Sequence, residues 1–221
     1  MKKILALVLA GCLLWSQAAF AALTKTTEST DDWTAVAQNV VIEGTTLDTS
    51  DHYSTELHIQ AFLDSTTAHT GTEFIVQVSG NSTGDEDWED YTRFVAMIDT
   101  ANSENISDNP LAATSTTITM ADTGGEYETA PFAHWIAIED STLINSELVL
   151  QKGFTLNTNI TIVDGTTNSH VQNTTMYDIA ISRTVTVGFP VHRCRVIVNN
   201  TFDADGSTIN FKVRAVAVTG I

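Results

Sequence analysis

The chain has 221 residues, with 10 Lys or Arg against 27 Asp or Glu, and its formal net charge at pH 7 is −17. A surface of this sign repels phosphate backbones and anionic lipid, so the charge argues against nucleic acid as a partner. After the N-terminal segment no stretch approaches the roughly 20 apolar residues that a spanning helix needs, so we expect a mature chain that does not span a membrane.

The first 21 residues (1–21) have the pattern of a secretory signal peptide. Two lysines at positions 2–3 form the positive n-region, an apolar run covers 4–14, and Ala19-Phe20-Ala21 is the small-x-small pattern that signal peptidase reads. We predict cleavage after Ala21 and a protein that is secreted to the extracellular space or the cell surface. The alternative is a lipoprotein, because Leu9-Ala10-Gly11-Cys12 resembles a lipobox whose Cys12 carries the lipid.

An extended polar segment, residues 22–32, precedes the first apolar pattern of the mature chain. Extended segments can add a strand to an exposed sheet edge of another molecule. We therefore expect this segment to take part in contacts between subunits.

Strand patterns dominate residues 33–108. Apolar residues alternate over 57–63, where Phe62 breaks the polar face, and short apolar runs of strand length occur at 74–78 and 94–98. Thr fills 35 of the 221 positions, and residues branched at Cβ favour strands because branching restricts χ1 in helices. No segment of the mature chain has a convincing 3.6-residue period, so we expect very little helix.

Residues 109–178 have shorter strand patterns than their flanks. Strands are predicted in this part within 116–120, 134–139, 147–151 and 159–165. Such short strands predict a small β-barrel inserted into a larger sandwich, whose two halves are residues 33–108 and 179–221. The predicted fold class is all-β: an antiparallel, jelly-roll-like β-sandwich with a small inserted β-barrel.

The C-terminal region 193–219 is predicted to form two alternating strands. Cys194 alternates with polar neighbours, so we interpret it as a small buried strand residue. One apolar face of the second strand consists of Ile209, Phe211, Val213, Ala215 and Ala217. Asp205-Gly206 lies between the two strands and is a strong hairpin signal.

Half of the mature chain's basic residues fall in this predicted hairpin. Arg193 and Arg195 share one face of the first strand, and Lys212 and Arg214 share one face of the second, so the hairpin is expected to present one basic ladder. Two interpretations stay open. The four residues pair with acidic neighbours on a solvated face, or they form an interface that docks on the acidic surface of the next subunit.

The strand motifs in the middle of the chain, TITM, WIAIED, SELV and ITIVDGTTNSH, occur in an order that resembles small β-barrel modules of bacteriophage tail and virion-surface proteins. The flanking stretches 57–88 and 193–216 are similar to uncharacterised phage or prophage structural proteins. This resemblance covers most of the mature chain and implies a structural subunit of a virion-like particle. The export signal is a departure from it, because a virion protein assembled in the cytoplasm needs none.

Motifs that carry chemistry are weak in this sequence. Gly80-Asn81-Ser82-Thr83-Gly84 matches the Gly-x-Ser-x-Gly nucleophile elbow, but an elbow needs a following helix, and the acidic run Asp85–Asp90 follows instead. This run, or Asp203 and Asp205, could supply carboxylate oxygens to Ca²⁺, although a solvated turn is the preferred interpretation of both. The six histidines are scattered singly, which gives no zinc spacing. We predict no enzyme, no metal site and no cofactor.

The sequence therefore predicts a non-enzymatic structural subunit of an extracellular or virion-like assembly, whose partners are copies of itself or other assembly subunits. The alternative is a secreted binding module, an adhesin or a carbohydrate binder that uses the aromatic residues Trp88, Tyr91 and Tyr127. A secreted hydrolase is the third reading, and it requires acids that converge in a pocket.

Overall fold

The computed structural model describes residues 23–84, 87–121, 134–155, 158–188, 190–201 and 207–219, apart from the side chains of Ser29 and Thr30. These residues form fifteen strands and one short 3₁₀-helix, η2 (Leu143–Asn145). The strands pair antiparallel in three sheets, which confirms the predicted all-β fold class. Within these ranges no helix is long and apolar enough to cross a membrane.

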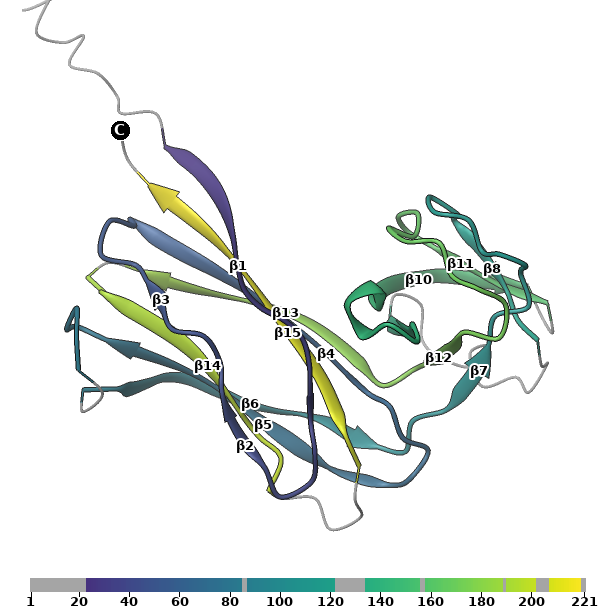
Figure 1. Ribbon diagram of the computed structural model, residues 1–221, viewed down its shortest axis with the longest axis horizontal. Helices are drawn as coiled ribbons and strands as arrows, with labels where there is room; N and C mark the ends of the chain where they lie inside the picture. The colour runs from purple at the N-terminus through teal and green to yellow at the C-terminus, as the bar shows by residue number, and fades with distance from the viewer. Residues whose placement is uncertain are drawn as a thin grey trace, which may run out of the picture.

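Two of the sheets face each other as the layers of a sandwich (Figure 1). The first sheet has the strand order β1 (Thr24–Val36), β15 (Ile209–Thr219), β4 (Ser54–Leu63), β13 (Ala180–Gly188). The second sheet has the order β2 (Val41–Glu43), β14 (Arg193–Asn199), β5 (His69–Ser79), β6 (Glu89–Asp99), and β3 (Leu47–Asp48) also pairs with β14. Each layer therefore combines strands from both ends of the chain.

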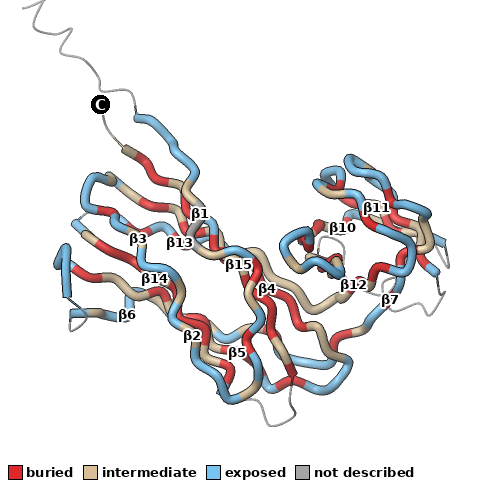
Figure 2. Tube along the Cα trace, in the orientation of Figure 1, coloured by how far each residue is buried: buried red, intermediate tan, exposed pale blue. Residues whose placement is uncertain are grey.

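The core of the sandwich lies between these two layers. Its residues occupy every second position of a strand, because side chains alternate between the two faces of a sheet. On β4, the buried residues Leu57, Ile59 and Ala61 alternate with partly exposed ones, because successive side chains of a strand point to opposite faces. Figure 2 shows such buried positions recurring along strands of both layers. Burying a side chain of this size stabilises by about 1.5–3 kcal/mol relative to exposing it, so the alternation decides which face of each strand turns inward.

The third sheet, here called the inserted sheet, is built from strands that lie between residues 103 and 177. Its order is β7 (Ser103–Asn105), β12 (Thr175–Tyr177), β9 (Trp135–Glu139), β10 (Glu147–Thr155), β11 (Asn159–Ile162), β8 (Thr117–Thr119). A bridge between Ile106 and Met120 joins its two end strands, and the Ser107 N–H donates to the Thr119 carbonyl at 2.8 Å. The sheet therefore curls onto itself around a core of its own, as expected for a small barrel.

The inserted sheet packs on the outer face of the first sheet through aromatic rings. The ring of Trp33 meets that of Phe62 edge to face at 5.2 Å, and Phe62 stacks on Tyr177 at 6.3 Å between ring centres. The indole N–H of Trp33 also donates to the carbonyl of Ser146 at 2.6 Å. This contact explains why Phe62 breaks the alternation of β4: its side chain is buried on the outer face, under the inserted sheet.

Three expectations about connectivity are wrong. The extended segment 22–32 was expected to contact another subunit, but from Thr24 onward it pairs as β1 along β15 of the same chain, where no association cost opposes pairing. The strands at 193–219 form no hairpin, because β14 and β15 belong to different sheets and each already has neighbours on both sides. The segment 103–108, expected in the sandwich, begins with β7 of the inserted sheet.

Candidate interaction surface

Arg193 and Arg195 bind groups of their own chain, and both guanidinium groups lie on the ring of Trp88. The nearly buried guanidinium of Arg193 donates to the Asn81 carbonyl at 2.7 Å, to the Ser79 hydroxyl at 3.2 Å and to the Gly84 carbonyl at 2.5 Å. That of Arg195 donates to Glu43 at 2.6 Å and to Gln77 at 3.0 Å. The guanidinium carbons of Arg193 and Arg195 lie 4.9 and 4.3 Å from the Trp88 ring centre, within cation–π range. Arg193 thus holds the connection between β5 and β6 in place.

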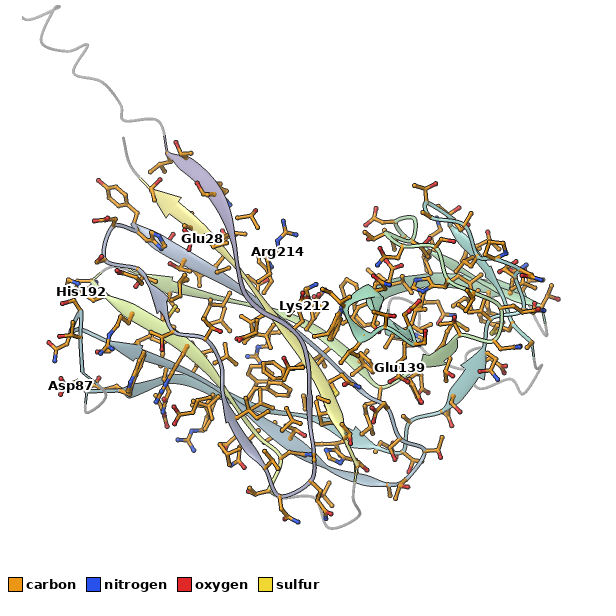
Figure 3. The ribbon with its side chains drawn as sticks, viewed as in Figure 1. Glu28, Asp87, Glu139, His192, Lys212 and Arg214 are labelled. Carbon is orange, nitrogen blue, oxygen red and sulfur yellow. The ribbon has the colours of Figure 1, made fainter. Side chains whose placement is uncertain are left out.

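Lys212 and Arg214 lie on the outer face of the first sheet, on the side of the inserted sheet (Figure 3). Lys212 pairs with Asp32 at 3.2 Å, and the exposed Arg214 donates to the Thr27 hydroxyl at 3.3 Å. Both line a cavity of about 410 Å³ between the first sheet and the inserted sheet.

The predicted single basic ladder is therefore wrong, because β14 and β15 belong to different layers. Arg193 and Arg195 act on the second sheet, and only Lys212 and Arg214 lie on the outer face of the first.

The acidic run 85–90 covers the end of the connection between β5 and β6 and the start of β6, on the second sheet, where Arg193 and Arg195 also lie. Asp85 and Glu86 lie outside the described residues, whereas Asp87 accepts a hydrogen bond from the Asn81 amide. Asp90 accepts from Gln77 at 2.9 Å and pairs with Arg93, and these two partners lower the pKa of Asp90. The described part of the run thus adjoins the two arginines of β14, because β5 and β14 are neighbours.

The two acidic segments that could supply oxygens to Ca²⁺ are the run 85–90 and the pair Asp203 and Asp205. Asp203 and Asp205 lie outside the described residues. Among the residues that the structure describes, no three or more His, Cys, Asp or Glu side chains are grouped so as to hold a metal ion. The segment 80–84 connects β5 to its antiparallel neighbour β6, which confirms its interpretation as a turn between strands.

Cys194 is a buried strand residue, as predicted. Burial, followed by the nearby charge of Glu28, raises the pKa of the thiol to about 12. The thiol is therefore protonated at neutral pH and lacks the thiolate character that a nucleophile needs.

A group of acids that the sequence did not suggest meets at the junction between the first sheet and the inserted sheet. Burial raises the pKa of Asp64, and burial together with the charge of Asp64 raises the pKa of Glu139. Burial and these two carboxylates raise the pKa of Tyr177 to about 12. Asp64 and Glu139 line a cavity of about 490 Å³, and the Asn210 amide donates to Asp64 at 2.8 Å.

His170 forms a second buried polar group within the inserted sheet. Its Nε2 lies 2.7 Å from a Glu147 carboxylate oxygen, and its Nδ1 lies 3.4 Å from Asp140. Glu147 also accepts from the N–H groups of Thr167 and Asn168 at 2.6 and 3.1 Å. Although burial alone raises the pKa of Glu147, these hydrogen bonds lower it below its ordinary value. The six histidines are scattered singly in the sequence, and their spacing gave no signal for this network.

Two of the three aromatic residues expected to bind a ligand, Trp88 and Tyr91, make contacts inside the chain. Trp88 is covered by two guanidinium groups, and the hydroxyl of Tyr91 donates to the Thr186 carbonyl at 3.1 Å. Tyr127 lies outside the described residues.

The free edges of the two layers adjoin along β13 and β6. The Arg183 guanidinium lies 4.1 Å from the ring centre of Phe94, which links the two edge strands. A groove of about 330 Å³ beside them is lined by residues 94–96 of β6, Trp135 of β9 and residues 180–183 of β13. This groove places apolar side chains next to the main chain of an edge strand, which is the arrangement that strand addition uses.

No protein-family model and no curated protein matches the sequence. Among solved structures the chain is similar to VP17, a capsid protein of bacteriophage P23-77, with 8% identity over 89% of this chain and 97% of that chain at a TM-score of 0.20. The infectious bursal disease virus Gt strain structure matches with 7% identity over 90% of this chain and 41% of that chain at a TM-score of 0.25. The VP16–VP17 complex of P23-77 matches with 9% identity over 88% and 98% at 0.19. These neighbours are phage and viral capsid proteins, and the TM-scores are too low to establish a shared fold.

Proposed function

We propose that this chain is a non-enzymatic structural subunit, exported from the cell, that self-associates into an extracellular or virion-like assembly. The observation that carries the proposal is the sheet edge at β13, which has no second strand partner among the described residues and lies beside a groove with apolar walls. Exposed strand edges are templates for pairing with another chain, and proteins that stay monomeric cover or charge them.

The reactive groups of the described residues support the same proposal. The Cys194 thiol is buried and protonated, and His170 is fully buried between two carboxylates. At the junction, burial raises the pKa of Asp64, and burial together with the charge of Asp64 raises the pKa of Glu139, inside a cavity that adjoins the packing of the inserted sheet. Of these groups, the His170–Glu147 pair links segments of the inserted sheet through hydrogen bonds.

Of the four basic residues predicted to form an interface, Lys212 and Arg214 are the two that a contact between subunits could use. They lie on one face of the first sheet in a chain whose net charge is −17, where any uncompensated contact between copies is repulsive. Interface roles for Arg193 and Arg195 are less compatible with their hydrogen bonds inside the chain.

The test is the association state of the exported protein. Light scattering after size exclusion, with negative-stain imaging, should show oligomers or particles whose share grows with protein concentration. Intact-mass measurement of the same material should give a chain that begins at Ala22, whereas a lipid on Cys12 would identify a lipoprotein instead. A protein that stays monomeric at high concentration and across ionic strengths would contradict the proposed function.

A further inference from the structure

We infer that β13 is the edge through which two copies of this chain first associate: β13 pairs antiparallel with β13 of a second copy about a two-fold axis at Ser182. The inference rests on the proposed function and names the surface that the self-association uses.

Within the part of the chain that the structure describes, one side of the β13 main chain has no strand partner. Backbone groups of a strand point alternately to its two sides. The carbonyl of Ile179 accepts from the N–H of Leu63 on β4, and the carbonyl of Thr186 accepts from the Tyr91 hydroxyl on the other side. Odd positions therefore face β4, and the N–H and C=O groups of Ala180, Ser182 and Thr184 face outward. Among the described strands, β4 is the partner of β13.

The long edge strands differ in how they are protected. β1 carries Glu28, Asp31 and Asp32 and has two register shifts against β15. β6 carries Glu89, Asp90 and Asp99 and has a register shift against β5. Acidic side chains and bulges are devices that prevent edge-to-edge pairing.

β13 has one charged side chain, Arg183, whose guanidinium lies on the Phe94 ring of the same chain, and it has neither acidic residues nor a bulge. It carries no acidic residue between Ala180 and Gly188 and keeps an unbroken register with β4 over nine residue pairs. The other edge strands of the described chain, β2, β3, β7 and β8, are two or three residues long. In a molecule with a net charge of −17, β13 is thus the long edge at which a second copy meets least repulsion.

Pairing of β13 with a second copy buries exposed apolar surface that lies beside this strand. Val95 and Ile98 on β6 are 55% and 60% exposed, and the groove beside β13 is walled by Phe94, Val95 and Trp135. A strand added to β13 extends the first sheet past this groove and covers its open side. Removal of this apolar surface from water favours the pair in addition to its main-chain hydrogen bonds.

Three centres of two-fold pairing lie near the middle of β13, at Ser182, Arg183 and Thr184, and the contacts favour the first of them. A centre at Arg183 places the two Arg183 side chains directly opposite each other, which like charges disfavour. A centre at Thr184 needs the Thr186 carbonyl, which already accepts from Tyr91. A centre at Ser182 places Ala180 opposite Thr184 and Arg183 opposite Ile181, and it forms roughly six main-chain hydrogen bonds.

A cysteine scan tests this register. In the exported protein Cys194 is buried, and Cys12 is either removed with the signal peptide or lipidated, so an introduced cysteine is the accessible thiol. Directly opposite residues of a hydrogen-bonded antiparallel pair have Cα atoms about 5.5 Å apart, within disulfide reach. Mild oxidation should convert Ser182→Cys into a covalent dimer, whereas the matched variant Thr184→Cys should stay unlinked, because its copies lie about 14 Å apart along the strands.

Proline variants test the hydrogen bonds of the same edge. Thr184→Pro removes an outward N–H inside the pairing and should abolish the dimer, whereas Thr186→Pro removes an outward N–H beyond it and should leave the dimer intact. Circular dichroism and thermal midpoints of both variants show whether the fold survives, and the cysteine result stands if either proline variant unfolds.

Crosslinking of Thr184→Cys instead of Ser182→Cys would overturn the register. If particles form while neither cysteine crosslinks, the inference fails and the proposed function stands; a monomeric unmodified protein defeats the proposed function itself.

Discussion

Replacing Arg193 with Ala tests whether this residue is a structural brace rather than part of a docking surface. The substitution leaves the Asn81 carbonyl, the Ser79 hydroxyl and the Gly84 carbonyl without their shared donor and removes the cation from one face of Trp88. Losing hydrogen bonds from a charged donor costs roughly 2 kcal/mol, and losing the cation–π contact costs roughly 1 kcal/mol. We therefore expect Arg193→Ala to lower the free energy of unfolding by about 3 kcal/mol.

Urea unfolding followed by tryptophan fluorescence measures this difference, with the slope against urea unchanged if the unfolded state is unaffected. The matched control is Arg214→Ala, since Arg214 is exposed and makes one long hydrogen bond, and we expect it to change the free energy by no more than about 0.5 kcal/mol. A loss of unfolding free energy below about 1 kcal/mol for Arg193→Ala would refute the reasoning. Such a small loss would mean that the contacts of Arg193 contribute little to stability and that its guanidinium group is free to bind another subunit.

Three further substitutions test the junction and the inserted sheet. Burial and the charge of Asp64 raise the pKa of Glu139, so ionisation of this carboxyl group opposes folding as pH rises through the folded pKa. Glu139→Gln should therefore raise the thermal midpoint at pH 7. The difference between the two midpoints should disappear below roughly pH 4, where the carboxyl group is protonated in both states. Hydrogen bonds lower the pKa of Glu147, so its carboxylate stabilises the fold above the unfolded pKa, and Glu147→Gln should lower the thermal midpoint at pH 7. This deficit should shrink only as pH falls below roughly 4, through the lowered folded pKa. Equal midpoints of variant and unmodified protein at every pH would contradict either assignment. Trp33→Ala removes the ring between the first sheet and the inserted sheet and should cost about 3–5 kcal/mol by denaturant unfolding, with faster proteolysis within 103–177; unchanged proteolysis would argue against the junction contact.

For the strands with a clear alternating pattern, the sequence by itself determined where the strand lies and which side of it is buried. Alternation over 57–63 and from Ile209 to Ala217 predicted the inward faces of β4 and β15, and the position of Cys194 in an alternating run predicted its burial. These predictions succeeded because a strand's period of two is a local property, and the free energy of burying apolar side chains acts on each strand separately.

Strand partners were decided only by the tertiary structure. Asp205-Gly206 signalled a hairpin, yet β14 pairs with β5, β2 and β3, while β15 pairs with β1 and β4. A turn signal describes a few residues, whereas the pairing of a strand depends on which layer its apolar face must cover. The ladder predicted for Arg193, Arg195, Lys212 and Arg214 was wrong for this reason, since sharing a face requires sharing a sheet.

The junction acids and the open edge of β13 lie beyond any local signal. Asp64 and Glu139 are far apart in the sequence and meet because the inserted sheet docks over Phe62, whose break in the alternation of β4 was the one visible trace of that contact. The pattern of residues 180–188 shows a strand but not that its second side is free. Which strand ends a sheet depends on the order of all strands within it, and that order is a property of the folded molecule as a whole.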